Sequence, residues 1–443
     1  MKKMFNHKYF LVVSILMHSF IIISCINNSD IETATNNTTE TTEIEKDNNE
    51  LQYPEYKITG LPTVIIDTNG VEIVDKENWV QGSMSIENQD EMFDDFINIP
   101  LFIKGRGNST WRQAPKKPYA IKFEKKQSVF GMPKHKRWVL IANYFDNTFI
   151  KNELAFYLSR TFELDYTVNG HFVNLVLNDE YIGLYWLGEA IKVDKSRVNI
   201  NDTKDFLIEL SGDKEDKWVF ESSIKKQNYI IKNDDYMNEE RFTFVQNKIS
   251  DLESILYNDY FPYKDESREE LLQLNDKIDL ESFAKMYLVE QIMNNRDFYP
   301  NEIGSAFLTL NSDTGLLRAC TVWDFDAAYI YEWPNLGPSK WDGLVYAESL
   351  YYDALFKLPE FCEIVKNILK EQSNLYEKCE IFIDNLALNL QTAIDFDIKR
   401  WGMHNDRSTL YVYMNYRETQ QFIDYVKRRL KTSIELVKNT YEN

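Results

Sequence analysis

The spacing of apolar residues changes along the chain, from strand-like in the first half to helix-like in the second. Short runs rich in β-branched and aromatic residues, such as 63–67, 71–74 and 206–210, are predicted strands, and they are separated by turn residues, including hairpin turns at 68–70 and 178–180. Beyond residue 210, apolar residues recur at helical spacing in segments 238–258, 279–295, 353–371, 375–397 and 417–440. The sequence therefore predicts an α+β, bilobal fold, with a β-rich N-terminal lobe (53–210) and a mainly helical C-terminal lobe (211–443).

The N-terminus is laid out like a secretory signal. A lysine-rich head, residues 1–8, precedes a mostly apolar run from 9 to 23 that ends at Ser24-Cys25. This resembles the lipobox of bacterial lipoproteins, in which the cysteine becomes the lipid-modified first residue. We expect residues 1–24 to be a signal peptide and Cys25 to be lipidated. An uncleaved membrane anchor is the alternative, although the apolar run is short for a full span.

The next segment, residues 25–52, is rich in Thr, Asn and Glu and carries few large apolar groups. Such a composition cannot bury enough surface to fold, so we predict a disordered linker after the lipidated cysteine. The protein is therefore expected to be exported and membrane-anchored, in the cell envelope or at the surface.

The charge of the chain excludes one class of partner. With 50 basic and 70 acidic residues, the formal net charge is −20. A chain this acidic would repel a phosphate backbone, so we expect it not to bind nucleic acid. The remaining cysteines, Cys320, Cys362 and Cys379, match no zinc spacing and are interpreted as small buried hydrophobes.

Three carboxylates are candidates for chemistry. Asp297 follows a predicted helix, and Asp324 and Asp326 flank Phe325 in an otherwise apolar run. An ionised carboxylate in apolar surroundings needs a cation or strong donors, and oxygen ligands suit magnesium or manganese. The sequence alone leaves two other interpretations open. Asp297 could be an ordinary loop residue, and Asp324 with Asp326 could bind an arginine or a structural calcium ion.

A glycine-containing loop is the candidate phosphate site. The run 104–111, Lys-Gly-Arg-Gly-Asn-Ser-Thr-Trp, lies between predicted strands and offers Arg106 and Asn108 beside backbone N–H groups. A tight hairpin is the alternative. In the following strand, Lys122 either reaches a phosphate or faces solvent. Glu153 lies one position off the apolar stripe of a helix predicted from a cap at 146–148.

Five runs, in order, resemble the spore-coat protein H (CotH) kinase-like family, and together they cover roughly residues 55–430. The runs are IKGRGNSTW (103–111), KKPYAIKF (116–123), LIANYFDNT (140–148), NDEYIGLY (178–185) and VWDFD (322–326). The resemblance implies an atypical protein-kinase-like fold and transfer of phosphate from ATP to protein serines.

The resemblance also implies roles for single residues. Asp297 matches the catalytic-loop aspartate, Asn301 the polar residue after it, and Asp324 with Asp326 the metal-binding Asp-x-Asp motif. Many relatives carry two asparagines where this chain has Asn301-Glu302, and a glutamate there would add negative charge to the metal site.

The nucleotide-binding residues follow from the same resemblance. The Arg106, Asn108 and Ser109 loop, with Lys117 or Lys122, would lie by the phosphates, and Glu153 would pair with the lysine. The expected cofactors are ATP and Mg²⁺ or Mn²⁺.

Two functions compete. The first is an exported ATP-dependent kinase acting on serine or threonine of an unidentified protein. The second is a non-catalytic envelope lipoprotein that uses the kinase-like scaffold to bind protein or glycan.

Overall fold

The computed structural model describes residues 55–87, 93, 95–212, 216–258, 274–298, 303–329, 332–333, 337–338, 343–403 and 418–442. The predicted signal peptide, the linker with Cys25, and Asn301 with Glu302 lie outside these residues. Within them, no helix is both long and apolar enough to cross a membrane.

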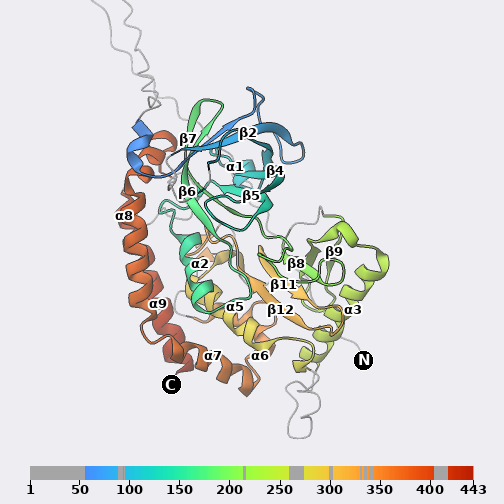
Figure 1. Ribbon diagram of the computed structural model, residues 1–443. Helices are drawn as coiled ribbons and strands as arrows, with labels where there is room; N and C mark the ends of the chain where they lie inside the picture. Colours follow the sequence, from blue (N-terminus) through green and yellow to red (C-terminus); the bar gives the residue numbers. More distant parts are fainter. Residues whose placement is uncertain are drawn as a thin grey trace, which may run out of the picture. The chain divides into compact units, whose positions relative to one another are not determined.

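Seven strands close into a barrel in the order β1-β2-β3-β4-β5-β7-β6 (Figure 1). Neighbouring strands are antiparallel, except that β1 and β6 pair in parallel, with Thr63 opposite Asn174, and so close the barrel. The interior holds alternate residues such as Ile121 and Phe123 of β4. The strands are β1 (Thr63–Asp67), β2 (Val80–Glu87), β3 (Ile99–Gly105), β4 (Tyr119–Gln127), β5 (His135–Ile141), β6 (Gly170–Leu177) and β7 (Glu180–Glu189).

A second sheet of five strands has the order β12-β11-β8-β10-β9. Its central strands, β8 and β11, are antiparallel partners, with Leu308 opposite Ile208. The strands are β8 (Phe206–Leu210), β9 (Val219–Glu221), β10 (Asn228–Ile231), β11 (Ala306–Leu310) and β12 (Leu317–Thr321). A separate short ribbon pairs β13 (Glu332–Trp333) with β14 (Gly337–Pro338).

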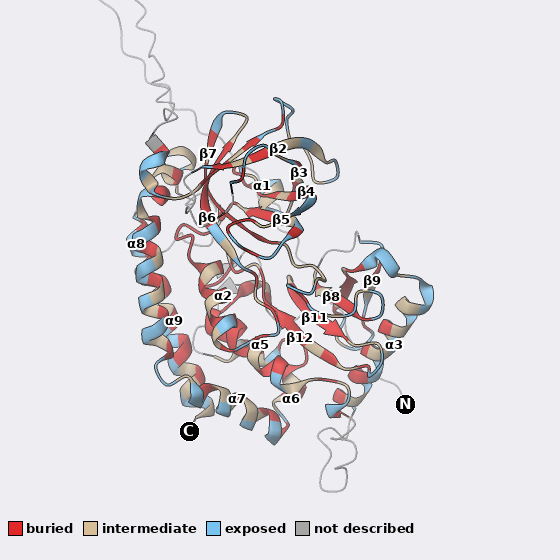
Figure 2. Cartoon of the chain, in the orientation of Figure 1, coloured by how far each residue is buried: buried red, intermediate tan, exposed pale blue. Residues whose placement is uncertain are grey.

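Helices pack around the second sheet and share one large apolar core with it (Figure 2). Helix α5 (Leu280–Met293) is buried over most of its length, in keeping with its largely apolar sequence. Among the described residues, the other helices are α1 (Ser109–Gln113), α2 (Lys151–Thr161), α3 (Glu239–Leu256), α6 (Tyr352–Leu355), α7 (Pro359–Glu371), α8 (Leu375–Trp401) and α9 (Thr419–Tyr441). Short 3₁₀ turns are η1 (Glu55–Thr59), η2 (Asp234–Tyr236), η3 (Arg296–Phe298) and η4 (Val345–Glu348).

The C-terminal end of α8 is attached to the barrel. Lys116, just before β4, points its ammonium group at Asp397 of α8, 2.6 Å away. The same carboxylate accepts a hydrogen bond from the backbone N–H of Leu184 in β7, at 2.8 Å. One turn further on, the Trp401 indole donates to the carbonyl of Ile182. The helix is therefore fixed to β7 by polar contacts.

The mixed α/β character predicted from the sequence is confirmed, and several elements match closely. The hairpin turn expected at 178–180 joins β6 and β7, and Asn178 and Asp179 both have positive φ, as a two-residue hairpin loop requires. The helix expected over 353–371 is divided into α6 and α7, because Pro359 begins a new helix at its first position.

One predicted strand is wrong. Residues 71–74 follow the turn after β1 but form no strand, and Val71 and Val74 are exposed. The partner of β1 is β2 instead. Directly after this segment, the Asp75 side chain accepts hydrogen bonds from the backbone N–H groups of Glu77 and Asn78, so the chain turns at 75–78.

Candidate functional site

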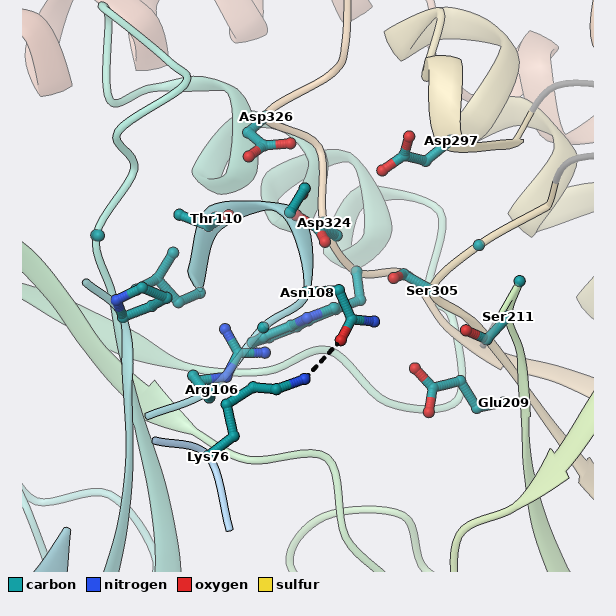
Figure 3. Close-up of a pocket in the computed structure, with 18 of the residues that line it drawn as sticks. Lys76, Arg106, Asn108, Thr110, Glu209, Ser211, Asp297, Ser305, Asp324 and Asp326 are labelled. Carbon is teal, nitrogen blue, oxygen red and sulfur yellow. Dashed lines mark hydrogen bonds between the residues drawn. The ribbon is translucent and has the colours of Figure 1, made fainter. Parts of the chain in front are cut away.

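A cavity of about 790 Å³ is lined by residues of the barrel and of the second sheet. It brings together Asp297, Asp324 and Asp326 with the loop that carries Arg106 and Asn108 (Figure 3). Ser109, at the start of α1, also lines it. Six of the residues singled out in the sequence therefore share one cavity, although they come from three separate segments.

The glycines of the loop after β3 are required by its shape. Gly107 has a φ of 78°, a conformation that favours glycine. At Gly105, a Cβ atom would lie 2.6 Å from the ring of Trp111. The N–H groups of Gly105 and Arg106 already bond to the carbonyls of Asp75 and Pro118. These two N–H groups are therefore already used within the protein, and the groups that the loop can offer to a phosphate include its side chains.

Arg106 is the basic residue that faces the carboxylates. Its guanidinium lies over the Trp323 ring, 5.5 Å from the centroid. Burial lowers the pKa of Arg106, while the charges of Asp324 and Glu209 act in the opposite direction. The planar guanidinium contacts the indole face and still has N–H donors that can bind phosphate oxygens.

Burial disfavours the ionised forms of both carboxylates of the Asp-Phe-Asp segment. Burial raises the pKa of Asp326 well above its ordinary value, and the charges of Asp324 and Asp297 raise it further, whereas Lys151 lowers it. Burial also raises the pKa of Asp324, whereas the positive charge of Arg106 lowers it. A cation bound between these carboxylates would remove the repulsion, so the donor set fits a divalent metal.

The described part of the chain holds no group of three or more His, Cys, Asp or Glu side chains suited to hold a metal ion. Two aspartates are nevertheless a sufficient protein contribution for Mg²⁺, which commonly completes its shell with substrate phosphates and water. Asn301, the third predicted metal ligand, lies outside the described residues.

Asp297 is brought beside the Asp-Phe-Asp segment by pairing of the backbones around it. Asn295 forms an isolated antiparallel bridge with Ala328, and the N–H of Tyr329 bonds to the carbonyl of Asn294. The Asp297 carbonyl accepts from the N–H of Gly304 at 2.7 Å. Asn294 ends α5 with a positive φ of 46°, which turns the chain toward the cavity. The spacing of these residues in the sequence does not reveal this pairing.

Three predicted nucleotide-binding residues are not among the described residues that line the cavity. Lys117 donates to the carbonyl of Trp111 at 2.6 Å, and Lys122 lies on β4 opposite Arg137 of β5. Glu153 accepts a hydrogen bond from the indole of Trp186 at 2.6 Å, and the cation beside it is Arg160, at 3.5 Å. The expected lysine–Glu153 pair is therefore corrected to an arginine–glutamate pair on α2.

The cavity also has charged residues that sequence reasoning missed. Lys76, two residues after the segment 71–74, donates to the Asn108 side chain at 3.0 Å. On the second sheet, Lys232 pairs with Glu209 at 2.9 Å and with Asp216 at 3.1 Å. Arg112 of α1 completes the basic residues of the lining. No motif marks these residues, because only the fold brings them to the cavity.

A comparison with protein families identifies the kinase-like class of this chain. The family model described as CotH kinase protein matches residues 103–433, and the chain belongs to this family. No curated protein matches the chain. A similar solved structure is the crystal structure of a Helicobacter pylori proinflammatory kinase, CtkA, at 10% identity and a TM-score of 0.26. The match covers 64% of this chain and 93% of that one.

Proposed function

We propose that the protein is an exported, metal-dependent ATP:protein phosphotransferase that acts on serine or threonine. The observation that carries the proposal is the shared cavity, in which three carboxylates meet a loop bearing a half-buried arginine. Phosphoryl transfer needs cations against the phosphate charge, aligned reactants and a group to orient the nucleophile, and these residues can supply all three. In this proposal the barrel acts as an N-terminal lobe and the helices with the second sheet as a C-terminal lobe.

Each group has a distinct role. Arg106 and Lys76 bind the phosphate oxygens of ATP, and the Asn108 amide orients the lysine. Asp324 and Asp326 hold the divalent ion, Mg²⁺ or Mn²⁺, which when bound neutralises charge on the transferred phosphate. Asp297 accepts the proton of the acceptor hydroxyl and directs its oxygen at the phosphorus.

The N-terminal residues support an envelope location. A signal peptide over residues 1–24 and a lipid on Cys25 would tether the folded body to a membrane through the polar linker. The acceptor would then be a protein of the envelope or surface. Substitution of Cys25 by alanine should move the protein from the membrane fraction to the soluble fraction, and an unchanged distribution would contradict lipidation.

Phosphate transfer by the purified mature chain tests the proposal. Incubation with γ-labelled ATP and Mg²⁺ or Mn²⁺ should label the chain or an added acceptor protein, and chelation of the metal should stop it. Asp297→Ala should abolish labelling and retain nucleotide binding. Asp313→Ala, at an exposed carboxylate paired with Lys204, is the matched control and should label normally.

If ATP neither labels nor thermally stabilises the wild-type chain, the phosphotransferase proposal is wrong. A non-catalytic scaffold that binds protein or glycan would then replace it.

A further inference from the structure

The first turn of α2 holds the backbone of the Asp-Phe-Asp segment on both sides of Phe325. The side-chain oxygen of Asn152 accepts a hydrogen bond from the N–H of Phe325, at 2.8 Å. The neighbouring Lys151 donates from Nζ to the carbonyl of Asp326, at 2.9 Å. Both α2 side chains are buried. Two consecutive residues of one helix therefore fix the peptide group that follows Asp324 and the peptide group that follows Asp326.

The α2 residues are themselves held in place. The amide nitrogen of Asn152 donates to the side-chain oxygen of Asn143, at 3.1 Å, in the turn after β5. The carboxylate of Asp146 accepts from the N–H of Lys151 at 3.0 Å and from the N–H of Thr148 at 2.9 Å. The segment from Asn143 to Asn152, which includes most of the LIANYFDNT run, therefore builds a rigid support.

The Asp-Phe-Asp backbone needs such support. Asp324 has a φ of 66°, in the left-handed region that most residues avoid. The Phe325 side chain is fully buried. If the Phe325 peptide rotates, the carboxylate before it and the carboxylate after it move in different directions. The hydrogen bond from Phe325 to Asn152 opposes that rotation.

We infer that Asn152 is a positioning residue that sets the geometry of the metal-holding carboxylates, Asp324 and Asp326. The inference rests on the proposed function, because it assigns Asn152 to the metal site of that reaction. Residues that orient the ligands of a metal commonly change metal affinity or activity by about 10–100-fold when they are substituted. Asn152 lines the cavity but acts through the backbone of Phe325.

The test measures metal binding directly, in the absence of catalysis. Mn²⁺ is titrated into the mature chain in the presence of a non-hydrolysable ATP analogue, and free Mn²⁺ is followed by electron paramagnetic resonance against a titration of the analogue alone. Asn152→Ala should weaken Mn²⁺ binding by about 10–100-fold. Asn152→Asp keeps an oxygen for the Phe325 N–H and should recover most of the affinity.

Two further variants separate positioning from general loss of structure. Ser159→Ala removes a buried hydroxyl of the same helix, which shares a 2.7 Å hydrogen bond with Thr167, and it should bind Mn²⁺ as the wild type does. Asn143→Gly removes the side-chain oxygen that accepts from the Asn152 amide. Asn143 has a φ of 49°, which glycine tolerates. Asn143→Gly should weaken Mn²⁺ binding less than Asn152→Ala, and it can be measured even if Asn152→Ala does not fold.

The outcomes are distinct. If Asn152→Ala folds and binds Mn²⁺ as tightly as the wild type does, the positioning role is wrong. If Asn152→Ala does not fold, wild-type Mn²⁺ affinity in Asn143→Gly has the same meaning. An equal loss of affinity in Ser159→Ala also overturns the positioning role. If the wild-type chain with the nucleotide analogue binds no Mn²⁺, the proposed function fails, and the inference fails with it.

Discussion

Nζ of Lys116 lies 2.6 Å from Oδ1 of Asp397, and the two side chains are 0% and 6% exposed. Burial lowers the pKa of Lys116 and raises that of Asp397, while the attraction between the two charges opposes both changes. The lysine also lies over the rings of Phe149 and Tyr185. This pair joins the barrel to α8, and removal of either charge leaves the other buried without its partner.

Lys116→Met should therefore lower the free energy of unfolding by about 3–5 kcal/mol, the usual cost of breaking a buried ion pair from one side. Urea denaturation followed by circular dichroism measures it. The double variant Lys116→Met/Asp397→Asn, which keeps an oxygen for the Leu184 N–H, should lose less than the sum of the single variants. Additive losses would show that the two charges do not depend on each other.

Nucleotide affinity should depend on Arg106 and not on Lys122. Arg106→Ala removes the guanidinium that faces Asp324 in the cavity, and we expect about 10–100-fold weaker binding of a fluorescent ATP analogue, as for a charge-assisted hydrogen bond of about 1.5–3 kcal/mol. Lys122→Ala, on β4 and not among the described cavity residues, should change the affinity by less than about twofold. A larger effect of Lys122 than of Arg106 would contradict our assignment of the phosphate site.

The loop after β3 should tolerate no side chain at Gly107. Gly107→Ala forces a Cβ onto a residue with a φ of 78°, so the loop should shift and stability should fall by about 1 kcal/mol. ATP binding, measured by calorimetry, should weaken as well. Gly212 also lines the cavity, but an added Cβ there meets no atom within 4 Å, so Gly212→Ala is the matched control. Equal effects of the two substitutions would argue against a conformational role for Gly107.

Stability should fall in mild acid because of His135. Burial, helped by the charge of Arg197, lowers the pKa of His135 from 6.5 to about 4 in the folded protein. Between about pH 4 and pH 6.5, His135 is therefore protonated in the unfolded chain and neutral in the folded chain. The stabilisation present above about pH 6.5 is lost as the pH falls to about 4, by up to about 3 kcal/mol.

His135→Asn isolates this contribution, because its oxygen can still accept from the N–H of Arg137, as Nδ1 does at 2.9 Å. Chemical denaturation at several pH values between 7 and 4 should show a shallower loss of stability in the variant than in the wild type. Parallel curves would assign the acid sensitivity to other groups.

Local patterns predicted the elements well wherever one face of an element is buried in a regular way. The alternation in β4 and the helical spacing in α9 both correspond to buried stripes in the structure. The 71–74 segment shows the limit of this reasoning. Its alternating pattern resembles a strand, but Val71 and Val74 are exposed, and the hydrogen bonds made by Asp75 turn the chain directly after it.

Asp324 and Asp326 could be chosen from the sequence because two carboxylates are unusual in an apolar run. Arg106 could be chosen from its glycine-containing loop, but the lysines could not, since a lysine looks the same in the sequence whether it faces a cavity or solvent. Lys76 and Lys232 reach the cavity only through the folding of a loop and of a second sheet. The role of Asn152 could not be predicted either, because its hydrogen-bond partner, Phe325, is 173 residues away in the sequence.

The contact of Arg106 with Trp323 gives the cavity an optical reporter. Tryptophan emission responds to a nearby positive charge and to solvent, and this indole lines the cavity under the guanidinium. A ligand that draws Arg106 away from the ring should change the emission of one of the nine tryptophans of the chain. Comparison with Trp323→Phe would isolate that signal, so occupancy could be followed in real time without any label on the ligand.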